Sequence, residues 1–260
     1  MKAKSFTIFG NPVAHSISPK MHGFAIEGLG LDATYTKTHL EGACRLRTLF
    51  LESFDAANVT VPHKEAAFGQ CDEVRGIAQE IGAVNTLINE NGHMIGYNTD
   101  AEGFYRSMQD FPNIKSALIL GAGGTAKAIS YILKEKGIEV SILNRSASRL
   151  EAFENFKTAT WENFEASYHD IIINTTSAGL EEETLPAPKN IMIGLFEHTK
   201  YAIDVIYNKE TPFLKMAKEY KIPTKDGADM LLYQGVLAFN LFYHDTFSFE
   251  EIVPFMQKAF

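Results

Sequence analysis

A lysine stands where a helix should begin, directly after a predicted strand. Residues 58–64 read NVTVPHK; a strand over 56–61 ends there, Pro62 suits a first helical turn, and Lys64 falls within that turn. A cation at this position opposes the helix dipole. Because such a break of a local rule often marks a functional site, Lys64 is a candidate acid–base group. The alternative is an exposed lysine whose side chain reaches into solvent.

Asn85 and Asp100 lie on or just beyond a predicted hairpin. Asn91-Gly92, between two apolar runs, is a strong signal for a two-residue β-turn. Thr99 and Glu102 then match a capping box at the start of a helix. Capping explains Thr99 and Glu102 better than it explains Asp100. Asp100 therefore remains a candidate functional residue, with Asn85 on the same hairpin.

Two serines sit two residues apart at the start of another predicted helix. Residues 10–22 read GNPVAHSISPKMH, with Ser18 as the N-cap before a proline. Hydroxyl groups and helix N-terminal N–H groups can grip a substrate carboxylate, which makes Ser16 and Ser18 candidates. A plain N-cap is the alternative for Ser18. His15 and His22 lack a carboxylate or cysteine partner at supporting spacing, so we expect no metal site.

A glycine-rich turn joins a strand to a helix in the second half of the chain. The strand Ser116–Leu120 runs into GAGGTAKA, and a helix follows to about Lys136. The first glycine permits a tight turn, and the later ones let the backbone approach a pyrophosphate. The spacing departs from strict G-x-G-x-x-G, and a turn without a ligand is the alternative. The candidate cofactor-binding residues here are Gly121, Ala122, Gly123, Gly124 and Thr125.

The end of the next strand indicates which dinucleotide would bind. NAD sites usually place Asp or Glu about 20 residues beyond the glycines, to bond the ribose 2′-hydroxyl. Here the chain has Asn144, Arg145 and Ser146, with Arg149 one turn further on. No carboxylate repels a 2′-phosphate, and two guanidinium groups can clamp one. The sequence thus favours NADP(H) over NAD, with solvated surface arginines as the alternative.

Two later segments carry polar side chains on apolar elements. Residues 204–208, DVIYN, end a buried strand. Because ligands in open α/β sheets bind beyond the carboxyl ends of strands, Tyr207 is a candidate, with rim packing as the alternative. Residues 227–234, GADMLLYQ, open a long apolar helix. The amide of Gln234 needs partners, which either a neighbouring helix or a substrate hydroxyl supplies.

Two sheets are needed to position these residues. Strands and helices alternate in both halves of the 260-residue chain, which predicts an α/β protein of two domains. An N-terminal α/β substrate domain with a mixed sheet is expected over 1–101, and a Rossmann-like NADP-binding domain over 102–236. Closing helices, from about 237 to 260, return to the first domain. Helices are expected over 43–53, 72–81, 229–244 and 248–258, and strands over 33–40, 138–143, 170–174 and 202–206.

The composition excludes several classes of protein. With 45% hydrophobic and 22% charged residues, the chain is neither disordered nor fibrous. A net charge of -8 argues against nucleic acid and anionic membranes as partners. The uncharged run from Met230 to Tyr243 is too short to span a bilayer. Two cysteines without metal or CxxC spacing suit a reducing cytoplasm, and no targeting segment is visible, so we expect a cytoplasmic protein.

Taken together, these motifs resemble the shikimate dehydrogenase family over nearly the whole chain. Each motif is short, but their order along the chain makes the resemblance specific. They are GNPVAHSISPKMH, NVTVPHK, GAVNT, NTD, GAGGTAKA, NRSASR, NTTSAG, DVIYN and GADMLLYQ. Gly23, Lys209, Thr125 and Lys127 depart from the usual family pattern, and the departure at Gly23 puts any role of that position in doubt.

The resemblance implies a reversible, NADPH-dependent reduction of 3-dehydroshikimate to shikimate, within the shikimate pathway to chorismate and the aromatic amino acids. Lys64 and Asp100 would be the catalytic pair. The substrate carboxylate would lie on Ser16, Ser18 and Tyr207, and the nicotinamide beside Val205 and Gly227. The ring hydroxyls would lie on Thr60, Lys64, Asn85, Asp100 and Gln234.

Several alternatives remain open from the sequence. A broader quinate/shikimate dehydrogenase would share most of these residues, and folate-linked dehydrogenases share the two-lobed layout without these substrate motifs. A non-catalytic NADP-binding module is a third possibility, against which the retention of both Lys64 and Asp100 argues. The expected partner is a small-molecule substrate. Both a monomer and a homodimer are compatible with the sequence.

Overall fold

The computed structural model describes residues 3–260, which form two compact units. The first unit contains the residues up to Phe104 together with Leu231–Phe260, and the second is Tyr105–Met230. Residues 231–236, which the sequence analysis assigned to the second domain, group with the first unit. Gln234 therefore lies in the first unit.

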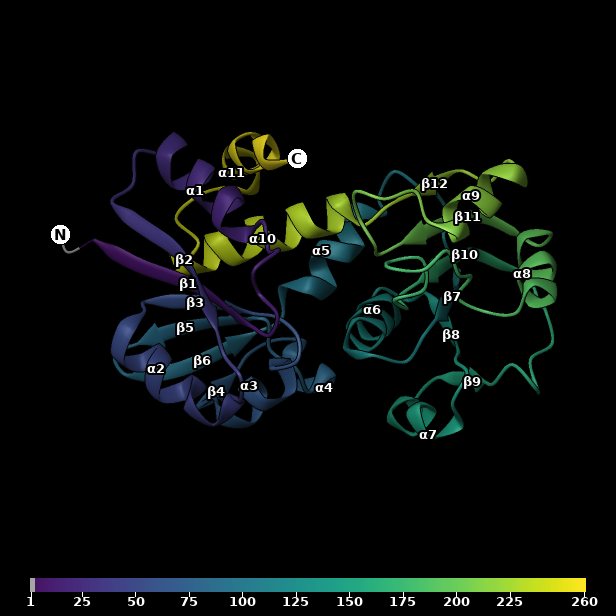
Figure 1. The fold of residues 1–260 in the computed structure, drawn as a ribbon, viewed down its shortest axis with the longest axis horizontal. Coiled ribbons are helices and arrows are strands. Elements are labelled where there is room, and N and C mark those ends of the chain that lie inside the picture. The colour runs from purple at the N-terminus through teal and green to yellow at the C-terminus, as the bar shows by residue number, and fades with distance from the viewer. Residues whose placement is uncertain (1–2) are drawn as a thin grey trace. The chain divides into compact units, whose positions relative to one another are not determined.

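Six strands form the sheet of the first unit, in the order β2-β1-β3-β5-β6-β4 (Figure 1). β1 pairs in parallel with β2 and β3, whereas β5 is antiparallel to β3 and β6. This arrangement confirms the mixed sheet. The bounds are β1 Lys4–Gly10, β2 Ala33–His39, β3 Ala56–Val59, β4 Glu73–Val74, β5 Thr86–Glu90 and β6 His93–Tyr97.

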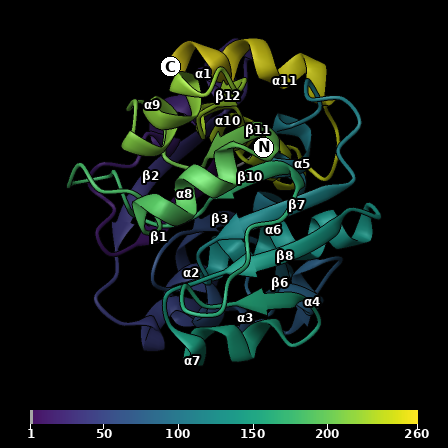
Figure 2. The ribbon, with the colours of Figure 1, turned by 90° about the vertical axis from the view of Figure 1, so that its right-hand side faces the viewer.

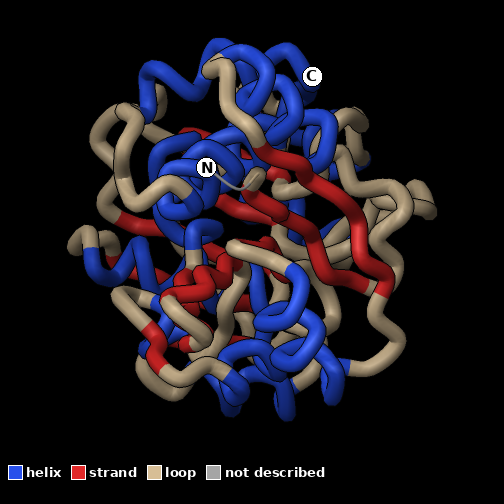
Figure 3. Tube along the Cα trace, turned by 90° about the vertical axis from the view of Figure 1, so that its left-hand side faces the viewer, coloured by secondary structure: helices blue, strands red, loops and turns tan. Residues whose placement is uncertain are grey.

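Helices cover both faces of this sheet (Figure 3). Phe6 and Phe9 are three positions apart on β1, so they point to opposite faces. Phe6 packs in a core with residues of α1, α10 and α11, and Phe9 packs in a core with residues of α2, α3 and α4. The bounds are α1 Ser18–Gly28, η1 Ala43–Arg45, α2 Leu46–Ser53, α3 Lys64–Gln70, α4 Ala78–Ile81, α5 Thr99–Ser107, α10 Ala228–Phe242, α11 Phe249–Met256 and η3 Gln257–Ala259.

The predicted hairpin is confirmed. Asn91 and Gly92 join β5 to β6 with φ angles of 56° and 86°. A turn with positive φ at both central residues has the twist that antiparallel strands need, and Asn-Gly adopts it at little cost. The hairpin places Asn85 directly before β5 and Asn98 directly after β6.

The second unit contains a six-stranded parallel sheet in the order β12-β11-β10-β7-β8-β9 (Figure 2). Counted from β7, this is the 3-2-1-4-5-6 order of a dinucleotide-binding sheet, which confirms the Rossmann-like prediction. The bounds are β7 Ser116–Leu120, β8 Glu139–Leu143, β9 Lys157–Ala159, β10 His169–Asn174, β11 Thr199–Asp204 and β12 Thr224–Lys225.

The helices of the second unit pack on this sheet. Residues of α8 and α9 share a core with β7, β8, β10 and β11, while α6 contacts β7 and β8. Within residues 3–260, no helix combines the length and the apolar character that crossing a membrane requires. The bounds are α6 Gly124–Glu135, α7 Ala147–Leu150, η2 Glu151–Phe153, α8 Lys189–Phe196 and α9 Pro212–Glu219.

Some local predictions are wrong. The helix expected over 72–81 is replaced by β4 and the short α4, because the backbone of this segment pairs with β6. Pro62 precedes α3 rather than opening it, and the helix starts at Lys64. β11 ends at Asp204, so Val205 and Ile206 lie in the loop after the strand.

Candidate active site

Lys64 and Asp100 form an ion pair at the starts of two helices. Lys64 is the first residue of α3, Asp100 is the second residue of α5, and Nζ lies 2.6 Å from Oδ2. The two side chains are 22% and 12% exposed, so the pair is shielded but still reachable from solvent. The helix dipole disfavours Lys64 and favours Asp100 at these positions, and the carboxylate offsets the cost of the cation. The pair sets a proton donor beside a carboxylate, as general acid–base chemistry requires.

Asn98 fixes the start of α5 and thereby the position of Asp100. Its Oδ1 accepts from the N–H groups of Asp100 and Ala101 at 3.1 and 3.3 Å, and its Nδ2 donates to the Ala83 carbonyl at 3.0 Å. Asn98 is therefore the side chain that caps this helix. The predicted capping box with Thr99 as the cap is wrong, because Thr99 is already the first helical residue.

Thr99 instead holds Asn85. The Thr99 N–H donates to Asn85 Oδ1 at 2.8 Å, and Asn85 Nδ2 donates to Thr99 Oγ1 at 3.0 Å. Asn85 is buried, and its own N–H donates to the Tyr97 carbonyl at 3.0 Å. These bonds tie the segment before β5 to the start of α5. The amide of Asn85 is thus placed on the same helix start as Asp100.

Ser16 and Ser18 bond to each other at the start of α1. Ser16 Oγ donates to Ser18 Oγ at 3.1 Å and accepts from the Ser18 N–H at 3.2 Å. The N-cap is Ile17, whose side chain cannot cap, and Ser18 is the first helical residue. The prediction that Ser18 is the N-cap is therefore wrong. Neither hydroxyl group is the side-chain cap of α1. The N-terminal N–H groups of this 11-residue helix therefore lie beside two hydroxyl groups.

Thr60 follows β3 and approaches the loop that leads to the serines. Its N–H donates to the Phe9 carbonyl at 2.9 Å. A Cβ atom on Gly10 would lie 2.4 Å from Thr60 Cγ2, so only glycine permits this approach. Because β1 and β3 are parallel, the loops after both strands leave the same edge of the sheet.

Gln234 lies half-buried on α10, where it donates through Nε2 to the Leu231 carbonyl at 2.8 Å. A Cβ atom on Gly103 would lie 2.7 Å from the Gln234 backbone nitrogen. α5 and α10 therefore pack at very short distance, which sets Gln234 against the helix whose second residue is Asp100. Its own helix thus supplies a partner for one of the two N–H groups of this amide.

Seven of the eight predicted substrate-binding residues belong to the first unit: Ser16, Ser18, Thr60, Lys64, Asn85, Asp100 and Gln234. Tyr207 belongs to the second unit, in the loop after β11. Among residues 3–260, no three His, Cys, Asp or Glu side chains cluster as metal ligands would.

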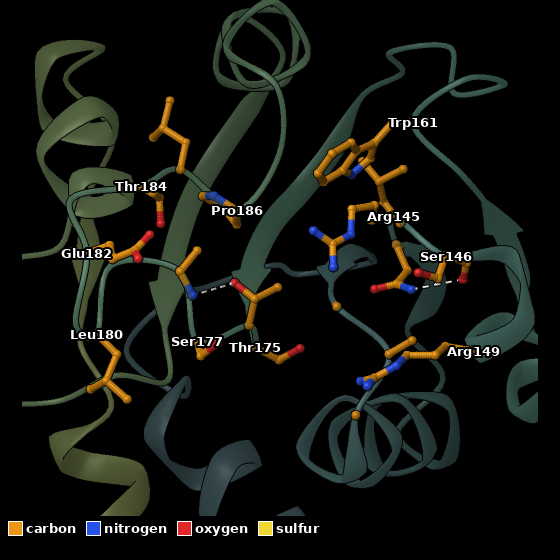
Figure 4. A pocket seen from close by; sticks show the side chains of 18 of the residues that line it. Arg145, Ser146, Arg149, Trp161, Thr175, Ser177, Leu180, Glu182, Thr184 and Pro186 are labelled. Atoms are coloured by element: carbon orange, nitrogen blue, oxygen red, sulfur yellow. Dashed lines mark hydrogen bonds between the residues drawn. The ribbon is translucent and has the colours of Figure 1, made fainter.

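The second unit carries a pocket of about 870 Å³ around the glycine-rich turn (Figure 4). Gly121 has a φ of 110°, and a Cβ atom there would lie 2.7 Å from Thr175 Oγ1, so this turn requires glycine. The predicted residues that line the pocket are Gly121, Ala122, Gly123, Asn144, Arg145, Ser146 and Arg149. Gly124 and Thr125 do not line it; they form the first turn of α6.

Arg145, in the loop after β8, and Arg149, on α7, point into this pocket (Figure 4). Both side chains are exposed, and neither forms an ion pair with a carboxylate of the described chain. Asn144 Nδ2 donates to the Ser146 carbonyl at 3.0 Å and fixes the bend between them. Two unpaired guanidinium groups beside a glycine-rich turn create a site for an anion such as a phosphate.

The sequence analysis missed several lining residues. Trp161 lies near Arg145 on one side of the pocket, and Glu182 and Thr184 lie on the other (Figure 4). Trp161 follows the three-residue β9. Because ligands bind beyond the carboxyl ends of parallel strands, this place in the sequence could have indicated a pocket residue. Four lining residues, Thr175, Thr176, Ser177 and Ala178, lie in NTTSAG, a motif of the family resemblance that was given no site residue of its own. The other missed residues are Leu143, Leu180, Glu181, Leu185 and Pro186.

Val205 and Gly227 adjoin each other, although neither lines this pocket. The Gly227 N–H donates to the Ile206 carbonyl at 3.0 Å, and a Cβ atom on Gly227 would lie 2.0 Å from the Val205 carbonyl oxygen. The segment before α10 thus lies directly on the loop that follows β11. No side chain larger than hydrogen is compatible with this packing.

A buried carboxylate that the sequence analysis did not single out organises the loop carrying Tyr207. Asp204 is fully buried and accepts from Asn174 Nδ2 at 3.0 Å, Thr211 Oγ1 at 2.7 Å and the Ile206 N–H at 3.0 Å. Burial raises the pKa of Asp204 above its ordinary value, and these hydrogen bonds oppose the rise. Asp204 therefore fixes the backbone directly before Tyr207.

The chain is similar to known proteins over its full length. Residues 8–87 match the model of the shikimate dehydrogenase substrate binding domain. The chain is 44% identical over 267 residues to the shikimate dehydrogenase (NADP(+)) of Helicobacter pylori strain J99, and the match covers 100% of both chains.

Solved structures show the same fold. The shikimate 5-dehydrogenase of Thermus thermophilus, solved in complex with NADP(H) and shikimate, matches 99% of this chain and 100% of its own, with a TM-score of 0.86 and 34% identity. The enzyme of Listeria monocytogenes, solved with shikimate and NAD, matches with a TM-score of 0.84 and 27% identity, covering 96% of this chain and 95% of its own. These matches confirm the resemblance seen in the sequence, and the chain belongs to the NADP-dependent shikimate dehydrogenase family.

Proposed function

We propose that the protein reduces 3-dehydroshikimate to shikimate with NADPH, and catalyses the reverse oxidation with NADP⁺. The observation that carries the proposal is the 2.6 Å contact between Lys64 and Asp100 at two adjoining helix starts. A buried amide, Asn85, and a serine pair at the start of α1 lie in the same unit. Family membership supports the identity of the substrate.

Lys64 acts as the general acid in the reductive direction. Hydride transfer to the substrate carbonyl carbon leaves negative charge on the carbonyl oxygen, which the ammonium group of Lys64 stabilises and protonates. Asp100 holds the lysine in position and accepts a hydrogen bond from the ring hydroxyl. In the oxidative direction Lys64 takes the proton from the hydroxyl group that becomes the carbonyl.

The remaining substrate contacts follow the chemistry of the side chains. Ser16 and Ser18 bind the carboxylate through their hydroxyl groups and the N-terminus of α1. Thr60, Asn85 and Gln234 bind ring hydroxyls. Tyr207 is assigned to the carboxylate by the family resemblance.

The pocket of the second unit suits NADPH. Its glycine turn is too tight for any side chain at Gly121, and Arg145 and Arg149 meet no carboxylate within the described chain. The pyrophosphate is assigned to the Gly121–Thr125 turn, and the 2′-phosphate to Asn144, Arg145, Ser146 and Arg149. Val205 and Gly227 are assigned to the nicotinamide side. When bound, NADPH supplies the hydride.

One assay tests this function. NADPH oxidation is followed at saturating 3-dehydroshikimate, beside NADH with the same substrate and quinate with NADP⁺. Turnover of 3-dehydroshikimate with NADPH supports the proposal, and rapid quinate oxidation would indicate the broader quinate/shikimate activity. Absence of turnover alongside tight NADPH binding would indicate a non-catalytic NADP-binding module.

The cellular setting is part of the proposal. We place the protein in the cytoplasm, where its cofactor and small-molecule substrate are available, as a monomer or a homodimer. Cell fractionation tests the location. Sedimentation velocity distinguishes the two oligomeric states.

A further inference from the structure

A chain of hydrogen bonds runs through the first unit from Tyr35 to Asn85. Tyr35 Oη on β2 donates to Asn58 Oδ1 on β3 at 2.7 Å. Asn58 Nδ2 donates to the Asn85 carbonyl and to Thr86 Oγ1, both at 3.3 Å. Tyr35 is thus connected through Asn58 to a residue that is proposed to bind a ring hydroxyl of the substrate.

The direction of these bonds is fixed by one backbone carbonyl. The carbonyl of Asn85 can only accept, so the amide of Asn58 must turn Nδ2 toward it and Oδ1 toward Tyr35. Tyr35 must then donate its phenol proton to Asn58.

The directions of the hydrogen bonds at the side chain of Asn85 follow from the same argument. Thr86 Oγ1 accepts from Asn58 and donates to Asn85 Oδ1 at 2.9 Å. Asn85 Oδ1 also accepts from the Thr99 N–H at 2.8 Å, so both of its acceptor positions are filled. Asn85 therefore offers a ligand only an N–H donor, and its partner on the substrate must accept.

The ring of Tyr35 is held by stacking rather than by its hydroxyl. It lies on His22, with centroids 4.3 Å apart and planes inclined by 19°. His22 also stacks on Phe242 at 5.6 Å. Burial lowers the pKa of His22 to about 3, so this imidazole is neutral at physiological pH. Phenylalanine in place of Tyr35 keeps the stack and removes only the hydroxyl.

Building on the proposed function, we propose that Tyr35 is a positioning residue for the substrate. Its hydroxyl holds the amide of Asn58 by donating to Oδ1, and Asn58 in turn fixes the segment that carries the amide of Asn85. Tyr35 need not touch the substrate to do this. Its loss loosens the contacts of Asn58 with Asn85 and Thr86, while the ion pair of Lys64 and Asp100 has no member in this chain of bonds.

The test compares two tyrosine-to-phenylalanine variants in one aromatic core. Tyr35→Phe leaves the oxygen of the buried Asn58 without its donor and is expected to raise KM for shikimate about tenfold. Its kcat and its KM for NADP⁺ are expected to stay close to those of the parent. Tyr243→Phe is the matched control, because Tyr243 Oη is buried without a hydrogen-bond partner among the described residues and its ring lies 5.0 Å from that of Phe239. Its KM should equal that of the parent.

The possible outcomes distinguish a failure of the proposed function from a failure of the inference about Tyr35. A parent protein that does not oxidise shikimate overturns the proposed function and this inference with it. An active parent with an unchanged KM in Tyr35→Phe overturns the inference alone, as does an equal rise of KM in both variants. If Tyr35→Phe does not fold, Asn58→Asp takes its place: it keeps the size of the side chain but cannot donate to Thr86. A KM for shikimate equal to that of the parent in Asn58→Asp overturns the inference.

Discussion

Lys64 Nζ lies 2.6 Å from Asp100 Oδ2, although the two residues are 36 positions apart in the sequence. Each lies in the first turn of a different helix. The start of α3 is anchored by the bond from the buried His63 ring to the Leu40 carbonyl, and the start of α5 by Asn98. The meeting of cation and carboxylate therefore results from the fold of the first unit. The predictions below follow from it and from the pocket of the second unit.

Asp100→Asn is expected to lower kcat for shikimate about 10- to 100-fold, the usual effect of losing a charge-assisted hydrogen bond. An amide keeps the shape of the side chain but not the charge that holds Lys64. Asp229→Asn is the matched control, because Asp229 is likewise the second residue of a helix and pairs with a lysine, Lys225, at 3.0 Å. Equal losses of kcat in the two variants would mean that Asp100 acts only in folding.

Arg145→Ala is expected to weaken NADPH binding about tenfold or more and NADH binding much less. The reason is that a guanidinium group without a carboxylate partner is free to bind the 2′-phosphate that only NADPH carries. Fluorescence titration with both cofactors measures the difference. Arg45→Ala, an exposed arginine on η1, serves as the control, and an equal loss for NADPH and NADH in Arg145→Ala would show that Arg145 does not bind the phosphate.

Gln234→Ala is expected to raise KM for shikimate while the dissociation constant of NADPH stays unchanged. Its amide lies on α10 where this helix packs against α5, and one of its two N–H groups is used within its own helix. Gln109→Ala removes a similar bond, from Nε2 to the Tyr105 carbonyl at 2.9 Å, and should leave KM unchanged. The reverse pattern, weaker NADPH binding with an unaltered KM for shikimate, would mean that Gln234 has a structural role and does not bind the substrate.

The free energy of unfolding is expected to fall as the pH falls from about 6.5 toward 3. Burial lowers the pKa of His22 from 6.5 to about 3 in the folded state. Between these values the unfolded chain binds the proton and the folded chain does not, so acid favours unfolding by about 1.4 kcal/mol per pH unit from this group. Urea titrations of the parent and of His22→Phe at several pH values isolate the contribution of His22 to the pH dependence of the free energy of unfolding. A pH slope that is the same in both proteins would contradict the neutral state of His22.

Motifs at the ends of strands were predictable from the sequence. The glycine turn after β7, the Asn-Gly hairpin and Lys64 at a helix start each depend on a few neighbouring residues, and the structure has all three. Local chemistry determines such features, because turns and helix starts are closed by side chains within four residues.

Features that depend on distant partners were not predictable. Thr99 matched a capping signal, but a bond to Asn85, fourteen residues away, uses its hydroxyl instead. The helix expected over 72–81 is lost to pairing with β6, which no local pattern reveals. Tertiary contacts decide these cases over local propensity.

The most direct test of the central claim is the turnover number of Lys64→Ala with shikimate and NADP⁺, measured beside the dissociation constant of NADPH. The account predicts that kcat falls by about 10²–10⁴, the range for a general acid–base group. NADPH should bind as in the parent, because its proposed site lies in the other unit, and Lys20→Ala, which removes a lysine of the same unit, should turn over like the parent. A folded Lys64→Ala protein that binds NADPH and turns over at the rate of the parent would contradict the role of Lys64.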